Sequence, residues 1–508
     1  MNVSRLLRWP VAAAYLLGAA FCVFAGFSAR RAMIAATALL AFAAWRFLLG
    51  KSPRLQQVGK WLDEHPAVVL LLIFVAAVIA RIDYAASLPE NGLRQMQGSD
   101  AGGFLEWASQ MSQGSFPNTK SWVTTGVFAL TFKIFGNNLT AAVLLNSIFQ
   151  FATAYLLYLF ARRHFGSKAA LFSAFIYLLS PSIVFLNFRV QTECPYFFLL
   201  AATLLTLSEW IRNRRLYAIA LLPLEIWLTV WTRGEGLLLF ALVPMCLLVD
   251  AATSNRRVKS GVIATAYLAC ALVALGLFGV FLNSTYHGTK TPFCSNDSYW
   301  PRLYGSNVLS QGRVSGPKTA PPGVKLVNDK TLIYERYRKD HLGDPDKGVL
   351  TRRRMECPAP LVPYIREEIA RRWAALTFWG KVKFVLVKER LPWRHPLVRS
   401  GQIPCKSKEK LRNYDILPSI SLLACFVGMI VYFRREMKSA ATGETMLRLV
   451  PLLYVFGIFC MIAIAESNIR YGVIALLMLP VYAFPAPLDE TTTSRLSASQ
   501  TSAKAPSE

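Results

Sequence analysis

Two carboxylates in this sequence have a setting that suits acid and base chemistry. Asp100 stands in a glycine-rich stretch, GSDAGG, directly before apolar residues at 104, 108 and 111. This helical spacing predicts a helix that starts near Asp100. A carboxylate at such a start can cap the first helical turn, or it can approach a substrate hydroxyl and remove its proton. Both roles stay open for Asp100.

Glu193 and Glu106 are the next acidic candidates. Glu193 precedes Cys194 and Pro195, and a proline in the first turn is typical of a helix start. A negative charge there gains about 0.3–1 kcal/mol from the helix dipole, so a purely structural role also fits. We expect Glu193 to be a second catalytic residue or to orient the substrate, and Glu106 to bind substrate.

Three arginines and a tyrosine complete the set of candidate site residues. Arg81 ends an apolar run, Arg233 lies in TRGEG, and Arg470 precedes Tyr471. Such residues can be anchors whose long side chains reach the membrane interface. Alternatively, their planar guanidinium groups bind a phosphate. We predict that Arg81, Arg233, Arg470 and Tyr471 bind substrate.

The composition of the chain predicts that membrane-spanning helices position these residues. The chain has 508 residues, of which 54% are hydrophobic and 17% charged, and its mean hydropathy is +0.37. Soluble domains have about 25% charged residues, and a spanning helix needs about 20 apolar residues. The sequence therefore predicts an all-α polytopic membrane protein with about 12 transmembrane helices and two large external loops. We place the spans near 9–28, 32–49, 66–82, 139–161, 168–188, 194–210, 215–232, 235–251, 261–282, 415–433, 447–465 and 470–487.

Basic residues predict the orientation of these spans. With a cytoplasmic N-terminus, basic clusters fall in the inner loops 50–65, 162–168, 211–214, 252–260 and 434–446, as the positive-inside rule requires. The run 121–136 is short for a span. A full span there would reverse the orientation of every later span and put four basic clusters outside. We therefore expect an interfacial or re-entrant helix at 121–136, and all the candidate site residues at the outer face.

This topology divides the chain into five regions. Residues 1–65 hold two N-terminal spans, although their basic start also fits a secretory signal peptide. Residues 66–283 form a membrane core that includes the first external loop, 83–138. Residues 284–414 form the second loop, with 26 Lys and Arg against 11 Asp and Glu. Residues 415–487 hold the last spans, and 488–508 form a disordered cytoplasmic tail.

The large loop has two further features. Apolar residues recur at helical spacing over 363–379 with charges opposite them, which predicts an amphipathic helix on the membrane surface. Cys294, Cys357 and Cys405 allow one disulfide if the loop faces an oxidising compartment. The sequence does not choose the pair.

Several common site motifs are absent from the sequence. It has no P-loop, no GxGxxG after a strand, no HExxH and no paired CxxC, and its five histidines are dispersed. We expect no metal site and no nucleic-acid partner, and the motifs leave any cofactor unknown.

The order of these features resembles the GT-C superfamily of membrane glycosyltransferases, in particular bacterial proteins similar to protein O-mannosyltransferases and lipid A aminoarabinose transferases. The resemblance rests on Arg81 at a span end, Asp100 with Phe104 and Ala108, and the run 127–136. It continues through Thr192-Glu193, Thr232-Arg233 and Ile469-Arg470-Tyr471. Protein O-mannosyltransferases typically have Asp-Glu where this chain has Asp100-Ala101.

The resemblance implies an enzyme that takes a sugar from a polyprenyl-phosphate carrier and passes it to a glycan, lipid or protein acceptor. It implies that Asp100 is the base, and that Arg233, Arg470 and basic loop residues hold the phosphate. The expected location is the bacterial inner membrane, with membrane lipids as partners and the active site on the periplasmic side. A flippase of lipid-linked saccharides and a polysaccharide polymerase or ligase are alternatives. A flippase should have broken spans or polar residues near the membrane midplane.

The orientation leads to a labelling prediction. Cysteines introduced beside Arg162 and Arg212 should be protected from a membrane-impermeant thiol reagent in intact cells, because the basic clusters face the cytoplasm. A cysteine at Ser310 should react. The opposite labelling pattern would contradict the proposed topology.

Overall fold

The computed structural model describes residues 3–26, 57, 60–61, 64–97, 100–117, 119, 121–253, 258–287, 292, 336–337, 340, 362–374, 377–380, 416–437, 442–464 and 472–483. Within these ranges the protein is helical and has no strand. The predicted all-α class is therefore confirmed. The predicted span at 32–49, the tail 488–508 and most of the loop 284–414 lie outside the described residues.

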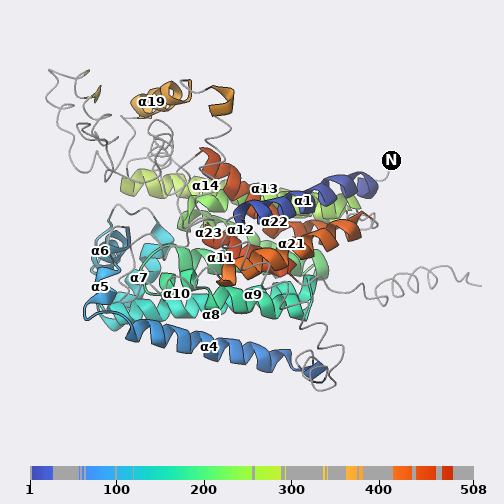
Figure 1. Cartoon of the computed structure of the whole chain (residues 1–508). Helices are drawn as coiled ribbons and strands as arrows, with labels where there is room; N and C mark the ends of the chain where they lie inside the picture. Colours follow the sequence, from blue (N-terminus) through green and yellow to red (C-terminus); the bar gives the residue numbers. More distant parts are fainter. Residues whose placement is uncertain are drawn as a thin grey trace, which may run out of the picture.

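Most helices form one bundle (Figure 1). Its elements are α1 Val3–Gly26, α4 Pro66–Ala86, α8 Leu139–His164, α9 Ser167–Leu179, α10 Pro181–Asn187, α11 Glu193–Asn213, α12 Leu216–Thr232, η1 Gly234–Leu238, α13 Leu239–Thr253, α14 Val258–His287, α21 Ile416–Glu436, α22 Gly443–Ile464, α23 Gly472–Met478 and η8 Pro480–Tyr482. Three shorter helices, α5 Gly92–Gln95, α6 Asp100–Ser112 and α7 Trp122–Phe135, lie at one end of it.

Five described helices are long and apolar enough to cross a membrane. They are Pro66–Ala86, Leu139–His164, Glu193–Asn213, Gly234–Thr253 and Gly261–Thr285. The bent pair α9 and α10 makes a sixth if it is one span, and Leu7–Cys22, Trp122–Phe135 and Leu216–Thr232 are shorter apolar helices. The protein is thus a multi-pass membrane protein, while the total of twelve spans stays a prediction.

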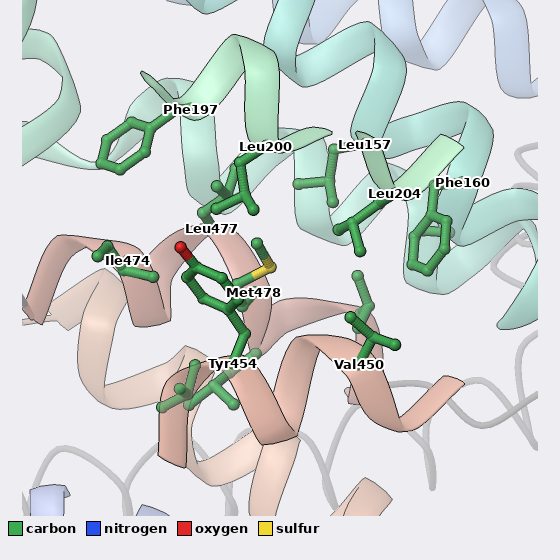
Figure 2. Close-up of a cluster of buried hydrophobic side chains, with 14 of the residues drawn as sticks. Leu157, Phe160, Phe197, Leu200, Leu204, Val450, Tyr454, Ile474, Leu477 and Met478 are labelled. Atoms are coloured by element: carbon green, nitrogen blue, oxygen red, sulfur yellow. The ribbon is translucent and has the colours of Figure 1, made fainter. Parts of the chain in front are cut away.

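The bundle has a continuous apolar core. Phe160 of α8, Leu204 of α11 and Val450 of α22 belong to it (Figure 2). The N-terminal helix α1 packs against α21, and Tyr15 stacks on Tyr432 with ring centroids 5.4 Å apart. Segments from both ends of the chain therefore share one core.

The span predicted at 168–188 is broken in the structure. Helices α9 and α10 meet at an angle of 56°, and Ser180 between them is extended at φ −61° and ψ 125°. Pro181 explains the break, because proline disfavours helical backbone in the residue before it and lacks an N–H group. Carbonyl groups at the end of α9 then need other donors, and Arg81 Nη1 donates to one of them, that of Leu178, at 3.3 Å.

Polar side chains of α8 bond carbonyl groups of α10 and of the residues that follow it. Gln150 Nε2 donates to the carbonyl of Ile183 at 2.8 Å, and Asn146 Nδ2 donates to the carbonyls of Asn187 at 3.1 Å and Arg189 at 2.8 Å. An unsatisfied backbone group costs several kcal/mol inside a membrane. The polar residues of α8 therefore stabilise the broken helix beside them.

Basic residues of several predicted inner loops meet at one end of the bundle, here called the basic end. Arg163 pairs with Glu209, Arg212 donates to the carbonyl of Arg163 at 3.3 Å, and Arg214 pairs with Asp250. The helices α5, α6 and α7 lie at the opposite end, here called the α6 end (Figure 1).

The basic end leads to a stability prediction. The Asp250 side chain is only 4% exposed, so Asp250→Ala leaves the Arg214 charge without this partner. Breaking a buried ion pair is strongly destabilising, and we expect a loss of about 2 kcal/mol or more. Thermal unfolding of the purified protein in detergent measures the loss. In the matched control Arg212→Gln the pair with Glu444 is exposed, so a loss below about 1 kcal/mol is expected. Equal losses in both variants would contradict the conclusion that the buried pair Arg214–Asp250 stabilises the fold more than the exposed pair Arg212–Glu444.

Candidate active site

Three charged side chains form a cluster at the α6 end, where α11 begins and α12 ends. Arg233 Nη1 donates to Glu193 Oε1 at 2.9 Å and to Thr192 Oγ1 at 3.1 Å. On its other side the guanidinium binds Glu235 through two hydrogen bonds. Nη2 donates to Oε1 at 2.7 Å, and Nε donates to Oε2 at 3.3 Å. Such two-point pairing is among the strongest polar contacts in proteins. We call these three side chains the Glu–Arg–Glu cluster.

The Glu–Arg–Glu cluster is largely shielded from solvent. The side chains of Glu193, Arg233 and Glu235 are 2%, 13% and 10% exposed. With both carboxylates ionised, the cluster has two negative charges and one positive charge. In this arrangement the guanidinium balances carboxylates, and a phosphate would have to displace one of them to reach the same donors.

The backbone after α12 creates this geometry. Helix α12 ends at Thr232, and Arg233 is extended at φ −151° and ψ 139°, so the chain turns sharply into η1. A Cβ atom on Gly236 would lie 2.8 Å from the backbone nitrogen of Val230. Only glycine lets η1 fold back this closely over the end of α12. That turn places Glu235 opposite the guanidinium.

The predicted catalytic residue Asp100 is the first residue of α6, as its spacing predicted. Its side chain lies outside the described part of the chain. Helix α6 packs through Phe104 and Ala108 against Phe128 of α7 and Val190. Glu106 points away from this contact, is exposed, and accepts from Gln110 Nε2 at 3.3 Å.

The segment before α6 is tied to the segment before α11. Gln97 donates to the carbonyl of Phe188 at 2.7 Å and accepts from the N–H of Val190 at 3.0 Å. Asp100 and Glu193 each follow this contact by three residues. Ser121, which caps α7 through the N–H of Thr124, donates to the carbonyl of Trp231 at 3.1 Å. Two contacts therefore hold the first loop beside the Glu–Arg–Glu cluster.

Arg81 lies apart from the Glu–Arg–Glu cluster, in the interior. Its Nη2 donates to Gln150 Oε1 at 2.5 Å and its Nη1 to the carbonyl of Ala77 at 2.8 Å. Gln150 also donates to Cys194 Sγ at 3.4 Å. Arg81 thus connects to the residue next to Glu193 through one side chain. Arg470 and Tyr471 lie outside the described residues.

Some polar residues of the spans were missed in the sequence. Glu225 stands in the middle of α12 and accepts from Thr206 Oγ1 of α11 at 2.9 Å. Its position within an apolar run is the signal that could have found it, since a carboxyl group within a span points to function. The polar residues therefore do not gather only at span ends. Among the described residues, no group of three or more His, Cys, Asp or Glu could hold a metal ion.

The Glu–Arg–Glu cluster leads to a second stability prediction. Arg233→Gln should reduce the unfolding free energy by about 3–5 kcal/mol, because it leaves two buried carboxylates without their shared cation. Adding Glu193→Gln and Glu235→Gln should restore part of the loss. Thermal unfolding in detergent compares the variants, with Arg162→Gln at the basic end as the control. A triple variant that is no more stable than the single one would contradict the electrostatic explanation.

A model of one known protein family matches part of this chain. Residues 120–282 match the family model described as dolichyl-phosphate-mannose-protein mannosyltransferase. No curated protein matches the chain. The matched range runs from the start of α7 into α14 and contains the whole Glu–Arg–Glu cluster. Arg81, Asp100 and the helices α21 to α23 lie outside it. The match confirms the resemblance to the GT-C superfamily, and it supports a multi-pass membrane glycosyltransferase of the GT-C type.

Proposed function

We propose that this protein transfers a sugar from a polyprenyl-phosphate carrier to an acceptor hydroxyl at the outer face of the membrane. The observation that carries the proposal is the family match over residues 120–282, which contains the buried Glu–Arg–Glu cluster beside the start of α6. A lipid-linked donor agrees with the absence of nucleotide-binding motifs from the sequence. The active site then lies at the α6 end, which we assign to the periplasmic side of a bacterial inner membrane.

The proposed reaction is a single displacement. Asp100 accepts the proton of the acceptor hydroxyl as its oxygen forms a bond to the anomeric carbon. The bond from that carbon to the phosphate oxygen breaks, and polyprenyl phosphate leaves with the electron pair. The configuration at the anomeric carbon inverts. The first-loop helix α6 supplies the base, and the Gln97 contacts tie the segment before α6 to the segment before α11.

The Glu–Arg–Glu cluster has a different task from the base in this proposal. Its carboxylates have oxygen atoms that accept hydrogen bonds from sugar hydroxyls, and Arg233 holds both at fixed positions. Arg470, Tyr471 and basic residues of the loop 284–414 then bind the leaving phosphate, where a fixed cation stabilises the developing charge. Arg233 takes part in phosphate binding only if it exchanges one carboxylate partner.

A flippase of lipid-linked saccharides is the second candidate. Two observations favour it, the bend between α9 and α10 and the carboxyl group of Glu225 in the middle of α12. The bend, however, follows from Pro181, and the charged cluster lies at the helix ends. The enzyme is therefore the better supported proposal. The acceptor stays open among glycans, lipids and proteins.

A turnover assay separates the two candidates. The purified protein is incubated with a panel of polyprenyl-phosphate-linked sugars and candidate acceptors, and the release of polyprenyl phosphate is measured. A transferase releases the carrier phosphate only when an acceptor is present. Transport into vesicles without any release would overturn the proposal in favour of the flippase.

Asp100→Asn tests the base directly. Asparagine keeps the shape and part of the capping ability, but it does not take up the proton, so turnover should decrease by about 10²–10⁴-fold. Unfolding temperature should change little. Ser112→Ala, at the other end of the same helix, serves as the comparison. A folded Asp100→Asn variant with wild-type turnover would remove Asp100 from the mechanism.

A further inference from the structure

The Glu–Arg–Glu cluster is supported by a helix from the far end of the chain. Tyr454 of α22 donates its hydroxyl hydrogen to the carbonyl of Glu235 at 2.9 Å. The hydroxyl groups of Tyr454 and Tyr196 are also in hydrogen-bond contact. Both tyrosine side chains are fully buried. Figure 2 shows Tyr454 among the core side chains, with its oxygen directed toward α11.

The chemistry of the groups fixes the direction of these hydrogen bonds. A carbonyl oxygen only accepts, so the hydrogen of Tyr454 is used on Glu235. The contact between the two hydroxyl groups then requires Tyr196 to be the donor. The Tyr196 hydroxyl of α11 thus donates to the Tyr454 hydroxyl of α22, which donates to the backbone carbonyl of Glu235 in η1. We call these two hydrogen bonds the tyrosine relay. Three elements that are distant in sequence are joined by two hydrogen bonds.

The same tyrosine pair also touches the cation. The Arg233 guanidinium carbon lies 5.6 Å from the centre of the Tyr196 ring, a distance at which the ring face attracts a cation. The hydroxyl bond to Tyr454 keeps that ring in place. Tyr454 thus acts on both sides of the cluster, on Arg233 through Tyr196 and on Glu235 through its carbonyl.

Close packing brings α22 to this position. One helical turn after Tyr454, a Cβ atom on Gly457 would lie 2.6 Å from Leu238 of η1. The missing side chain allows the two segments to approach. Helix α22 lies outside the matched range 120–282, so the C-terminal region contributes to the site from beyond it.

We propose that Tyr454 is a positioning residue for the Glu–Arg–Glu cluster, and that the C-terminal helix α22 completes the active site. This inference rests on the proposed transferase function. Tyr454 does not touch the substrate in it. The Tyr454 hydroxyl sets the placement of Glu235 and, through Tyr196, that of Arg233.

The kinetic test compares two buried tyrosines. Tyr454→Phe removes the relay but keeps the ring. Tyr482→Phe is the matched control, because the Tyr482 hydroxyl also donates to a backbone carbonyl, that of Arg448 at 2.5 Å, and is equally buried. With a polyprenyl-phosphate-linked sugar that the wild-type protein uses, Tyr454→Phe should lower kcat/KM about tenfold or more, the size of one misplaced polar contact. Tyr482→Phe should lower it less than about threefold. Equal decreases would overturn the proposal.

A double variant distinguishes positioning from general stability. Because part of the effect of Tyr454 runs through Glu235, Tyr454→Phe should lower kcat/KM by a smaller factor in a Glu235→Gln background than in the wild-type protein. An undiminished effect there would show that Tyr454 acts elsewhere. An absence of any effect of Glu235→Gln on turnover would also overturn the inference, since there would be nothing to position.

The relay itself is tested without substrate. The unfolding temperatures of Tyr196→Phe, Tyr454→Phe and the double variant form a thermodynamic cycle, in which the single losses should not add. Tyr196→Phe with Tyr482→Phe should be additive. If no donor in the panel is turned over, the proposed function fails, while a coupled cycle still supports the relay. Additive losses for Tyr196→Phe and Tyr454→Phe would contradict the tyrosine relay.

Discussion

The pairing of one guanidinium with two carboxylates is the constraint on which the α6 end depends. A buried charge is stable only while it is paired and hydrogen-bonded. Glu193, Arg233 and Glu235 come from the start of α11 and from the turn after α12, so neither element can shift without separating charges. The cluster therefore fixes the relative position of two spans at the point where a polar substrate would meet the membrane surface.

The other polar groups in the interior follow the same physical rule. Asn146 and Gln150 donate to carbonyls of α10, and Arg81 is bonded to Gln150 and to the carbonyl of Leu178 at the end of α9. Because the interior offers no water, these side chains form hydrogen bonds with protein groups that also require a partner. The polar residues of α8 thus face the short helix α10 and the carbonyl groups at its end.

The two ends of the bundle use ion pairs in different ways. At the basic end, each of the pairs Arg163–Glu209 and Arg214–Asp250 joins one cation to one carboxylate and links neighbouring helices. At the α6 end, one cation is shared by two carboxylates from different elements next to the first loop. Separate pairs suit a structural role, whereas carboxylates held around a shared cation can also present oxygen atoms to a polar substrate. This contrast supports placing the chemistry at the α6 end.

The family match and the tyrosine relay together describe a site made from distant parts of the chain. The matched range supplies the charged cluster, the first loop supplies the candidate base, and α22 supplies the hydroxyl that holds η1. Helix α22 therefore reaches the charged cluster from outside the matched range.

Local patterns in the sequence predicted the helical class, the limits of several spans, the helix that starts at Asp100 and the meeting of basic clusters at one end. These features depend on local apolar spacing and charge. The sequence also assigned Glu193 and Arg233 to one face, but not their pairing with each other and with Glu235. That pairing, the angle between α9 and α10, the contacts of Gln150 and the contact of Tyr454 with Glu235 are visible only in the packed helices. Tyr454 and Glu235 are separated by 219 positions, and such contacts follow from the packing of whole helices, which local spacing does not encode.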